Sequence, residues 1–467
     1  MAAPVSEPQG AAAAAPASAA PPAPRPSVGD DLTLRIESLA FGGAGVARTP
    51  GGYVVFVEGG FPGDLVRARV HDRKRSYALA RVGTLLEPGP DQVAPLADHP
   101  GAPWQVLRYE RQLEIKQEQV DDALRRIGRL DGYTLEPIVA AEQQWRYRNK
   151  LEYSFGTGAD GTLLCGFHAP GSWERIHHIE DCLLASEAGN AARRQVLEFA
   201  RSQGLAAFDR RTREGFLRNL VVREGRRRGQ LMVRVVTSRG ELDPDALAGA
   251  VDCQGLLWTH TDARAETTAG GQTELIAGTY SIEERIGELD LRISPEAFFQ
   301  TNTEMAERLY GLIVEAAALR GWERVYDLYS GIGSIALTLA PRAGTVHGLE
   351  LVEDAVSDAI ENARRNEITN ASFYAGDVRL ALGELVTRAG RPDVMVLDPP
   401  RAGLSQKVVR RIIECSPNRI VYVSCNPTTL APNAAQLAEA GFRLESVTPI
   451  DMFPQTPHIE CVALLRR

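Results

Sequence analysis

The sequence predicts an α/β protein with a doubly wound parallel sheet at its C-terminal end, a small β-barrel near its N-terminus and a mixed α+β region between them. Three patterns support this division. Short strands separated by glycine turns occupy residues 30–87, mostly strand-like segments run from 135 to 293, and strands alternate regularly with helices from residue 295 onward. Because 467 residues exceed the length of one ordinary domain, we expect domains over residues 29–88, 89–293 and 294–467.

Composition excludes several classes of protein. Apolar residues make up 44% and charged residues 24% of the chain, which is typical of a globular protein with a sizeable core. No run of eighteen apolar residues occurs, so we expect no membrane partner. The six cysteines lack the spacing of a disulfide framework, which favours the reducing cytoplasm. Residues 1–28 are mostly Ala, Pro, Ser and Gly without a signal-peptide pattern, and we expect a disordered tail there.

The first expected domain has the strand and turn spacing of small barrels, an architecture that oligonucleotide-binding folds use. Its expected strands are Leu32–Leu39, Gly52–Val57, Asp64–His71 and Tyr77–Leu86. The net charge is −8, yet the chain contains two basic runs. They comprise Arg67, Arg69, His71, Arg73, Lys74, Arg75 and Arg81, then Arg223, Arg226, Arg227 and Arg228. Such runs are most often solvated surface, and a local RNA-binding surface is the alternative.

The central region begins with a helical pattern and continues mainly with strands. Residues 110–130 predict a helix, because their apolar side chains recur at helical spacing. Strands are expected at Tyr147–Phe155, Asn219–Val222 and Gln230–Thr237.

Three successive strand ends in the C-terminal region carry the residues of a nucleoside site. The strand Arg324–Tyr329 leads into Ser330-Gly331-Ile332-Gly333, a turn that lets the backbone approach a ligand at the start of a helix. The next strand ends at Glu350, where a doubly wound sheet places an acid for ribose hydroxyls. The third ends at Asp377, which could accept a hydrogen bond from an adenine amino group. No Gly-x-Gly-x-x-Gly motif occurs in the turn, so a nucleoside cofactor is favoured over a dinucleotide.

Two further strands end in potentially reactive side chains at the same edge. Asp393–Leu397 is followed by Asp398-Pro399-Pro400-Arg401, and Arg419–Val423 by Ser424-Cys425-Asn426-Pro427. An isolated cysteine is usually core packing, but Cys425 follows a buried strand and opens a polar loop. Glu460 begins the last apolar strand of an expected antiparallel hairpin, where a desolvated carboxylate could act as a base.

These motifs resemble those of the RNA uracil-5-methyltransferases, in the subgroup with an N-terminal TRAM RNA-binding domain. The resemblance covers about residues 30–467. It rests on Phe298-Phe299-Gln300-Thr301-Asn302, Asp327–Gly333, Asp398–Gly403, Ser424–Pro427 and Asp451–Glu460. It implies a class I, Rossmann-like methyltransferase domain that uses S-adenosyl-L-methionine to methylate uridine in RNA.

The resemblance also implies roles for individual residues. Cys425 corresponds to the nucleophile that adds to carbon-6 of uracil, and Glu460 to the base that removes the carbon-5 proton. The residues implied to contact or frame the cofactor site are Gln300, Tyr329, Ser334, Glu350, Asp377 and Asp398. The target base must leave its stack to reach such a pocket, so single-stranded or loop RNA is expected.

One departure from the family concerns a metal cluster. Many relatives bind an iron–sulfur cluster through a Cys-x5-Cys-x2-Cys run after the TRAM domain and a fourth cysteine further on. Here residues 95–104 contain no cysteine, and Cys182 alone matches the fourth position. We therefore expect no iron–sulfur cluster. For Cys165, His168, His178 and Cys182, core packing is favoured and a zinc site is the alternative.

Alternative functions are weighed on the same motifs. A cytosine-5 RNA methyltransferase usually has a second cysteine in the segment after the fourth strand. Here that segment reads Asp398-Pro399-Pro400-Arg401 and contains no cysteine, which counts against this alternative. A non-catalytic RNA-binding assembly factor would have no need of both Cys425 and Glu460. The TRAM-like domain favours ribosomal RNA over transfer RNA as the partner, and we expect a monomer.

Overall fold

A computed structural model describes residues 25–467. The tail expected over residues 1–28 lies outside the described residues except for 25–28, which belong to no helix or strand. The chain divides into two compact units between Pro90 and Asp91, and each is described by itself. The domain boundary expected near residue 293, within the second unit, stays a prediction.

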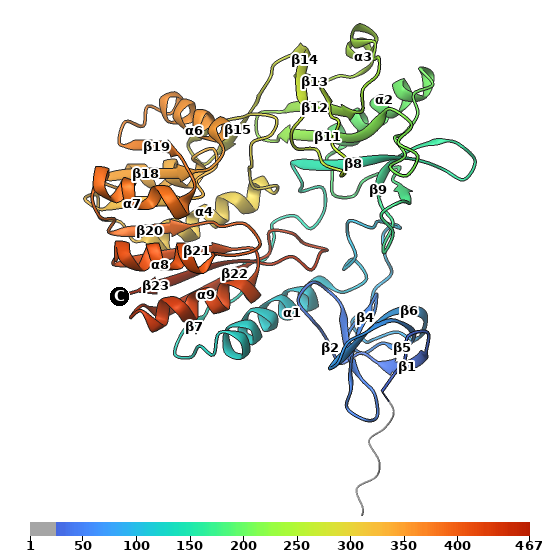
Figure 1. The fold of residues 1–467 in the computed structure, drawn as a ribbon, viewed down its shortest axis with the longest axis horizontal. Helices are drawn as coiled ribbons and strands as arrows, with labels where there is room; N and C mark the ends of the chain where they lie inside the picture. The colour runs from blue at the N-terminus through green and yellow to red at the C-terminus, as the bar shows by residue number, and fades with distance from the viewer. Residues whose placement is uncertain (1–24) are drawn as a thin grey trace, which may run out of the picture. The chain divides into compact units, whose positions relative to one another are not determined.

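The N-terminal unit is a six-stranded sheet of short strands (Figure 1). The strands are β1 (Asp31–Arg35), β2 (Ser38–Leu39), β3 (Gly45–Arg48), β4 (Val54–Glu58), β5 (Leu65–Arg73) and β6 (Tyr77–Glu87). They are hydrogen-bonded in the order β1-β5-β6-β4-β3-β2, and β1 also contacts β3, so the sheet curls on itself as a small barrel does. The strand expected over Leu32–Leu39 is in fact interrupted, and β3 was missed because four residues are too short to show an alternating pattern.

The first basic run lies on the surface because of the alternation along β5. Val66, Ala68 and Val70 are buried in the core of the unit, so the side chains between them lie on the opposite face of the strand. Some of these charges are paired, as in the ion pair of Arg69 with Asp31. The run is therefore an exposed and partly neutralised face of the sheet.

The second unit contains a seven-stranded mixed sheet in the order β10-β9-β8-β11-β12-β13-β14 (Figure 1). Its elements are β8 (Lys150–Thr157), β9 (Leu163–His168), β10 (Ile176–His178), α2 (Glu187–Ser202), β11 (Leu217–Gly225), β12 (Gln230–Thr237), α3 (Pro244–Ala250), β13 (Gly255–His260) and β14 (Gln272–Gly278). The expected strands at 219–222 and 230–237 form the antiparallel pair β11 and β12. Ser186 is the N-cap of helix α2, where its hydroxyl accepts a hydrogen bond from the Gly189 N–H, and the helix packs on β9 and β11.

The same unit contains an eight-stranded sheet in the order β19-β18-β17-β20-β21-β23-β22-β7. Its strands are β17 (Arg324–Leu328), β18 (Thr345–Glu350), β19 (Ala371–Ala375), β20 (Val394–Leu397), β21 (Arg419–Ser424), β22 (Arg443–Ile450) and β23 (Glu460–Arg466), with β7 at one edge. Strands β17 to β21 are parallel and their order runs outward in both directions from β17, which confirms the doubly wound prediction. The antiparallel hairpin of β22 and β23 extends the sheet.

Helices cover both faces of this parallel sheet. They are α4 (Thr303–Ala317), α5 (Ser334–Leu339), α6 (Glu353–Arg365), α7 (Val378–Ala389), α8 (Gln406–Cys415) and α9 (Pro427–Glu439). Figure 1 shows α7, α8 and α9 in front of the sheet and α4 behind it. The strand order reverses between β17 and β20, which is where open α/β sheets bind their ligands.

A segment from the start of the second unit completes the sheet. The expected helix over residues 110–130 is α1 (Tyr109–Asp122), which continues as a π-helical turn (Ala123–Ile127) against α9. Strand β7 (Thr134–Leu135) then pairs in parallel with β22. A short hairpin of β15 (Ile282–Ile286) and β16 (Leu289–Ile293) precedes α4. Within residues 25–467 no helix has the length and apolar character needed to cross a membrane.

Candidate active site

A cavity of about 900 Å³ lies at the carboxyl edge of the parallel sheet. That volume lies in the range of pockets that bind small-molecule cofactors. Seven of the eight site residues expected from the sequence line it: Gln300, Tyr329, Glu350, Asp377, Asp398, Cys425 and Glu460. The eighth, Ser334, is not in the lining. It lies at the start of α5, where its hydroxyl is hydrogen-bonded to the Tyr310 hydroxyl at 2.8 Å.

Glu350, at the end of β18, is held in place by backbone N–H groups. The Gly331 N–H donates to its Oε2 at 3.0 Å, and the N–H groups of Leu351 and Val352 donate to its Oε1 at 2.7 and 3.0 Å. These bonds fix the orientation of the carboxylate, and each oxygen has lone pairs left to accept further hydrogen bonds. The geometry suits ribose hydroxyls.

The turn after β17 bends through left-handed backbone conformations. Tyr329, Gly331 and Gly333 have φ of 67°, 52° and 83°. A Cβ on Gly333 would come within 2.8 Å of the Phe373 ring, so glycine is required there for helix α6 and strand β19 to pack against the turn. A Cβ on Gly331 would meet nothing closer than 3.9 Å, so the backbone at that residue faces open space beside the cavity.

Two of the predicted cofactor residues also have structural partners. Asp377 is the N-cap of α7, where its Oδ1 accepts a hydrogen bond from the Arg379 N–H at 2.8 Å. The backbone carbonyl of Gln300 accepts a hydrogen bond from the Asn149 side chain at 2.9 Å. The Asp377 side chain and the Gln300 backbone are thereby held at the cavity wall.

Cys425 and Glu460 lie beside each other at the ends of neighbouring antiparallel strands. Ser424 at the end of β21 is opposite Cys461 in β23, and one residue further the same register places Cys425 next to Glu460. Cys425 is half-buried, whereas Glu460 is only 3% exposed. Asn426 caps α9 by accepting the Thr428 N–H at 3.0 Å, which holds the loop that carries the thiol.

The electrostatic surroundings disfavour negative charge on these groups. Burial, followed by the nearby Glu460 and Asp398, raises the pKa of the Cys425 thiol to about 11. Burial raises the pKa of Asp398 to about 7, and burial together with Asp398 holds the pKa of Glu460 well above its usual range. Glu460 Oε1 is buried without a hydrogen-bond partner among residues 25–467. A carboxyl group with a free oxygen and a raised pKa is suited to proton transfer.

A buried ion pair holds the loop that leads into Glu460. Lys116 Nζ of α1 contacts Asp451 Oδ1 at 2.6 Å, and both side chains are fully buried. Lys116 also donates to the Phe453 carbonyl at 3.2 Å, and the Tyr109 hydroxyl donates to Asp451 Oδ2 at 2.8 Å. Helix α1 therefore positions the segment between β22 and β23 through buried polar bonds.

We expect Lys116→Met to lower the free energy of unfolding by about 3–5 kcal/mol, because it leaves the Asp451 carboxylate buried without its cation. Urea denaturation followed by circular dichroism measures the change. The exposed Lys407→Met on α8 is the matched control and should shift stability by less than about 0.5 kcal/mol. A Lys116→Met protein as stable as the control would show that the pair does not stabilise the fold.

The cavity also holds side chains that the sequence did not single out as site residues. They are Arg148, Phe298, Arg401, Phe453 and His458. Four of them, Phe298, Arg401, Phe453 and His458, belong to the motifs noted above, and their place beside the predicted site residues could have indicated them. Arg148 belongs to none of these motifs. It lies beside the cavity because its backbone pairs with that of Asn302, a contact between distant parts of the chain that the sequence does not indicate.

Comparison with known proteins agrees with this geometry. The family model described as tRNA (Uracil-5-)-methyltransferase matches residues 263–467, and the model of the TRAM domain matches residues 26–82. A protein of Halalkalibacterium halodurans named as an uncharacterized RNA methyltransferase is 37% identical over 93% of this chain and 97% of its own. A similarly named protein of Chlorobaculum tepidum is 37% identical over 94% of this chain and 97% of its own.

A solved structure extends the likeness to three dimensions. The tRNA (uracil-54, C5)-methyltransferase of Pyrococcus abyssi, in complex with S-adenosyl-L-homocysteine, matches with a TM-score of 0.75 and 28% identity. The match covers 93% of this chain and all of the other. This chain belongs to the RNA (uracil-5-)-methyltransferase family. Its N-terminal unit is a TRAM domain, and its eight-stranded sheet has the class I methyltransferase fold.

The cavity of this methyltransferase fits S-adenosyl-L-methionine. Glu350 offers oriented carboxylate oxygens, Gly331 leaves the adjacent backbone open, and Asp377 lies at the next strand end. The buried acid Asp398 lies in the same cavity. Carboxylates and an open glycine turn match a cationic nucleoside better than they match phosphates.

The residues considered for zinc do not assemble into a site. Cys182 Sγ lies 3.3 Å from His99 Nε2, His178 Nδ1 contacts the carbonyl of Cys165, and His168 is bonded to Glu266. Among residues 25–467 no group of three or more metal-ligating side chains is found. Cys165 and Cys182 are both fully buried in the apolar core of the seven-stranded sheet.

The raised pKa of Cys425 predicts an unusual pH dependence of alkylation. Because only the thiolate reacts, the rate of modification by iodoacetamide should rise about tenfold per pH unit from pH 7 to 10, without levelling near 8.5 as an ordinary thiol does. The rate is measured by mass spectrometry of the Cys425 peptide, with Cys425→Ala protein as the blank. A plateau below pH 9 would contradict the assigned surroundings of the thiol.

Proposed function

We propose that the protein methylates carbon-5 of a uridine in RNA through a covalent adduct between Cys425 and carbon-6 of the base. The observation that carries the proposal is the adjacency of a half-buried thiol and a buried carboxyl group in a cavity that fits S-adenosyl-L-methionine. Carbon-5 of uracil is too weak a nucleophile to accept a methyl group without such activation. A cysteine with a neighbouring base supplies both halves of the reaction.

The proposed reaction begins with the thiol. Cys425 loses its proton to a carboxylate, and its sulfur forms a bond to carbon-6 while the electrons of the double bond move onto the ring as an enolate. S-adenosyl-L-methionine would supply, when bound, an electrophilic methyl group on a sulfonium, and carbon-5 of the enolate accepts that group with its electron pair. Glu460 then removes the carbon-5 proton, the carbon-5 to carbon-6 double bond re-forms, and the bond from carbon-6 to sulfur breaks to return Cys425.

The pKa values suit a proton transfer that accompanies addition. With a pKa of about 11, little of the Cys425 thiol is ionised at neutral pH, so its proton must pass to a partner as the bond to carbon-6 forms. Asp398, with a pKa of about 7, is partly ionised at that pH and influences the thiol directly. We assign Asp398 to the proton exchange with Cys425, and Glu460 to carbon-5.

Ribosomal RNA is the substrate we propose, with transfer RNA as the alternative. The TRAM domain supports RNA binding in general, and the structural relative from Pyrococcus abyssi is named for a transfer RNA position. We further propose that residues 89–293 contribute to RNA binding and that the protein acts as a monomer. All six cysteines lie within the described residues and are free thiols, which accords with a location in the reducing cytoplasm.

The test supplies purified protein with labelled S-adenosyl-L-methionine and, separately, unmodified 23S ribosomal RNA and transfer RNA transcripts. The modified nucleoside is identified by mass spectrometry. We expect 5-methyluridine in ribosomal RNA; the same product in transfer RNA would change the substrate and keep the chemistry. Label in 5-methylcytidine, or bound cofactor without methyl transfer to either RNA, would overturn the proposal.

A further inference from the structure

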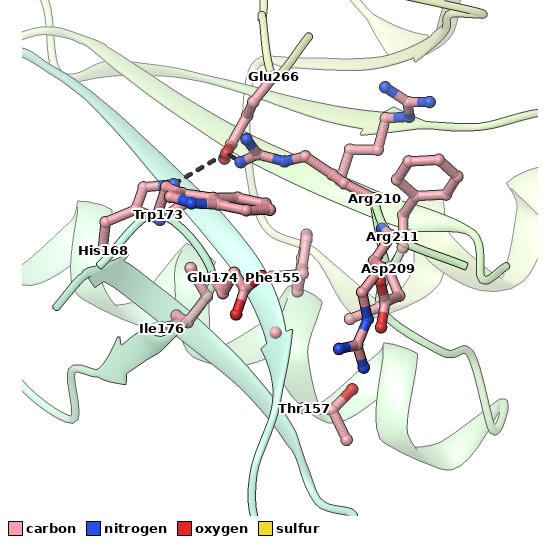
Figure 2. A pocket seen from close by; sticks show the side chains of 14 residues that line it. Phe155, Thr157, His168, Trp173, Glu174, Ile176, Asp209, Arg210, Arg211 and Glu266 are labelled. Atoms are coloured by element: carbon pink, nitrogen blue, oxygen red, sulfur yellow. Dashed lines mark hydrogen bonds and ion pairs between the residues drawn. The ribbon is translucent and has the colours of Figure 1, made fainter. Parts of the chain in front are cut away.

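A second, smaller cavity of about 190 Å³ lies at one end of the seven-stranded sheet. The ends of β8 and β9, the loop that carries Trp173, the loop at residues 207–211 and Glu266 form its walls. Figure 2 shows the head groups of Arg210 and Glu266 meeting beside the Trp173 ring, with Arg211 below them. None of these residues belongs to the catalytic cavity.

The pocket presents flat groups of the kind on which nucleobases stack. Trp173 is 59% exposed, although its ring is one of the largest apolar surfaces in the chain. The Arg210 guanidinium lies 5.7 Å from the centre of that ring, and the Arg218 guanidinium lies 3.9 Å above the ring of Phe208. Unstacked RNA bases are bound on aromatic rings and arginine planes of this type.

Three arginines, Arg210, Arg211 and Arg218, and three acids, Glu174, Asp209 and Glu266, line the pocket. Glu266 forms an ion pair with Arg210 and is hydrogen-bonded to His168 at 2.8 Å, so the Arg210 charge compensates its own within the pocket wall. The Asp209 carboxylate accepts the backbone N–H of Arg211 at 2.7 Å, which shapes the loop. The Arg211 side chain is exposed and has no hydrogen-bond or ion-pair partner within residues 25–467. An unpaired arginine at the mouth of an aromatic pocket suits a phosphate.

We propose that this pocket binds an unstacked nucleobase of the substrate RNA, with Trp173 as the stacking surface and Arg211 at the adjoining phosphate. The proposal deepens the proposed function and rests on it, since RNA is the occupant. The pocket is small by the standard of ligand sites, which favours one planar ring over a larger molecule.

Strand β8 connects this pocket to the catalytic cavity. Arg148, just before the strand, lines the catalytic cavity, and Phe155, near its other end, lines the second pocket. Seven steps of extended chain span roughly 24 Å. One RNA segment of several nucleotides can cover that distance, because successive nucleotides in a stacked strand are roughly 3.4 Å apart. The second base would thus lie several nucleotides from the target uridine within one loop or single strand.

The test compares Trp173→Ala and Trp173→Phe with Trp322→Ala. Trp322 is a matched control, because it is 64% exposed in the same unit and lines neither cavity. Binding to 23S ribosomal RNA and transfer RNA transcripts is measured by fluorescence anisotropy. For the RNA that wild-type protein binds more tightly, we expect Trp173→Ala to raise Kd about tenfold. Trp173→Phe should stay within about threefold and Trp322→Ala within about twofold of wild type, with kcat at saturating RNA unchanged throughout.

Photo-crosslinking gives a second readout that does not depend on methylation. With transcripts that contain 4-thiouridine, the wild-type protein should form crosslinks that map to the peptide containing Trp173, and Arg211→Gln should weaken binding with a smaller salt dependence. Equal Kd values for Trp173→Ala and Trp322→Ala, or crosslinks that avoid both pocket loops, would overturn the proposal and indicate another occupant. RNA binding through the pocket without any methyl transfer would overturn only the proposed function.

Discussion

Replacement of Cys425 by alanine is expected to reduce methyl transfer by at least about 10⁴-fold, because Cys425 is the one thiol among the described residues that line the cavity. The fold should be unaffected, since the thiol is half-buried at the end of β21 and its loop is held by Asn426. Cofactor binding should also persist, because Glu350 and the glycine turn belong to other strands.

The Cys425→Ala variant is assayed under single-turnover conditions with labelled S-adenosyl-L-methionine. Denaturing electrophoresis detects the covalent complex of protein and RNA, which the variant should fail to form. Cys253→Ala is the control, because Cys253 is half-buried too and lies outside the cavity. Full methyl transfer by the Cys425→Ala protein would show that the thiol is not the nucleophile.

Replacement of Glu460 by glutamine is expected to lower turnover by about 10²–10⁴-fold, the usual contribution of a general base. The steps that slow down should be the last two, removal of the carbon-5 proton and release of Cys425 from carbon-6. Addition and methylation remain available to Cys425, but the amide cannot accept the carbon-5 proton, so the thiolate cannot leave. A methylated covalent complex of protein and RNA should therefore accumulate, which distinguishes this variant from Cys425→Ala.

The measurement for Glu460→Gln follows labelled methyl groups in the covalent complex and in released RNA over time. Glu439→Gln, at an exposed residue at the end of α9, should behave as wild type. Burial is the main cause of the raised pKa of Cys425, and the substitution removes the second cause, the Glu460 carboxylate, so alkylation of the thiol should be faster at pH values where Glu460 is ionised. Normal turnover without accumulated complex would assign the base to another residue.

Much of the catalytic half could be predicted from local sequence. Parallel strands place their carboxyl ends at one edge of a sheet, so residues that follow strands collect there whatever the details of packing. This rule brought Tyr329, Glu350, Asp377, Asp398 and Cys425 to one cavity. The pairing of Cys425 with Glu460 depended in addition on the family resemblance, because the insertion of β23 between β21 and β22 leaves no periodic signal.

Other features depended on contacts between segments far apart in the chain. Ser334 follows the same glycine turn as Tyr329, yet the first turn of α5 directs it toward Tyr310 instead of the cavity. The four residues considered for zinc are near one another in sequence, but β-sheet alternation and separate partners keep them from converging. The sequence predicted a helix over residues 110–130, but it did not indicate that α1 places Lys116 in a buried ion pair with Asp451.

The sequence by itself determined the order of the elements, the doubly wound sheet and the edge at which the reactive residues collect. Hydrophobic periodicity and glycine turns act over a few residues, so these features can be read locally. Only the tertiary structure decided three contacts. Arg148 lines the catalytic cavity, α1 holds the segment before Glu460 through the Lys116–Asp451 ion pair, and Trp173 lies beside Arg210. Those contacts join strands and loops whose relative positions depend on the packing of the whole unit, and no short stretch of sequence encodes that packing.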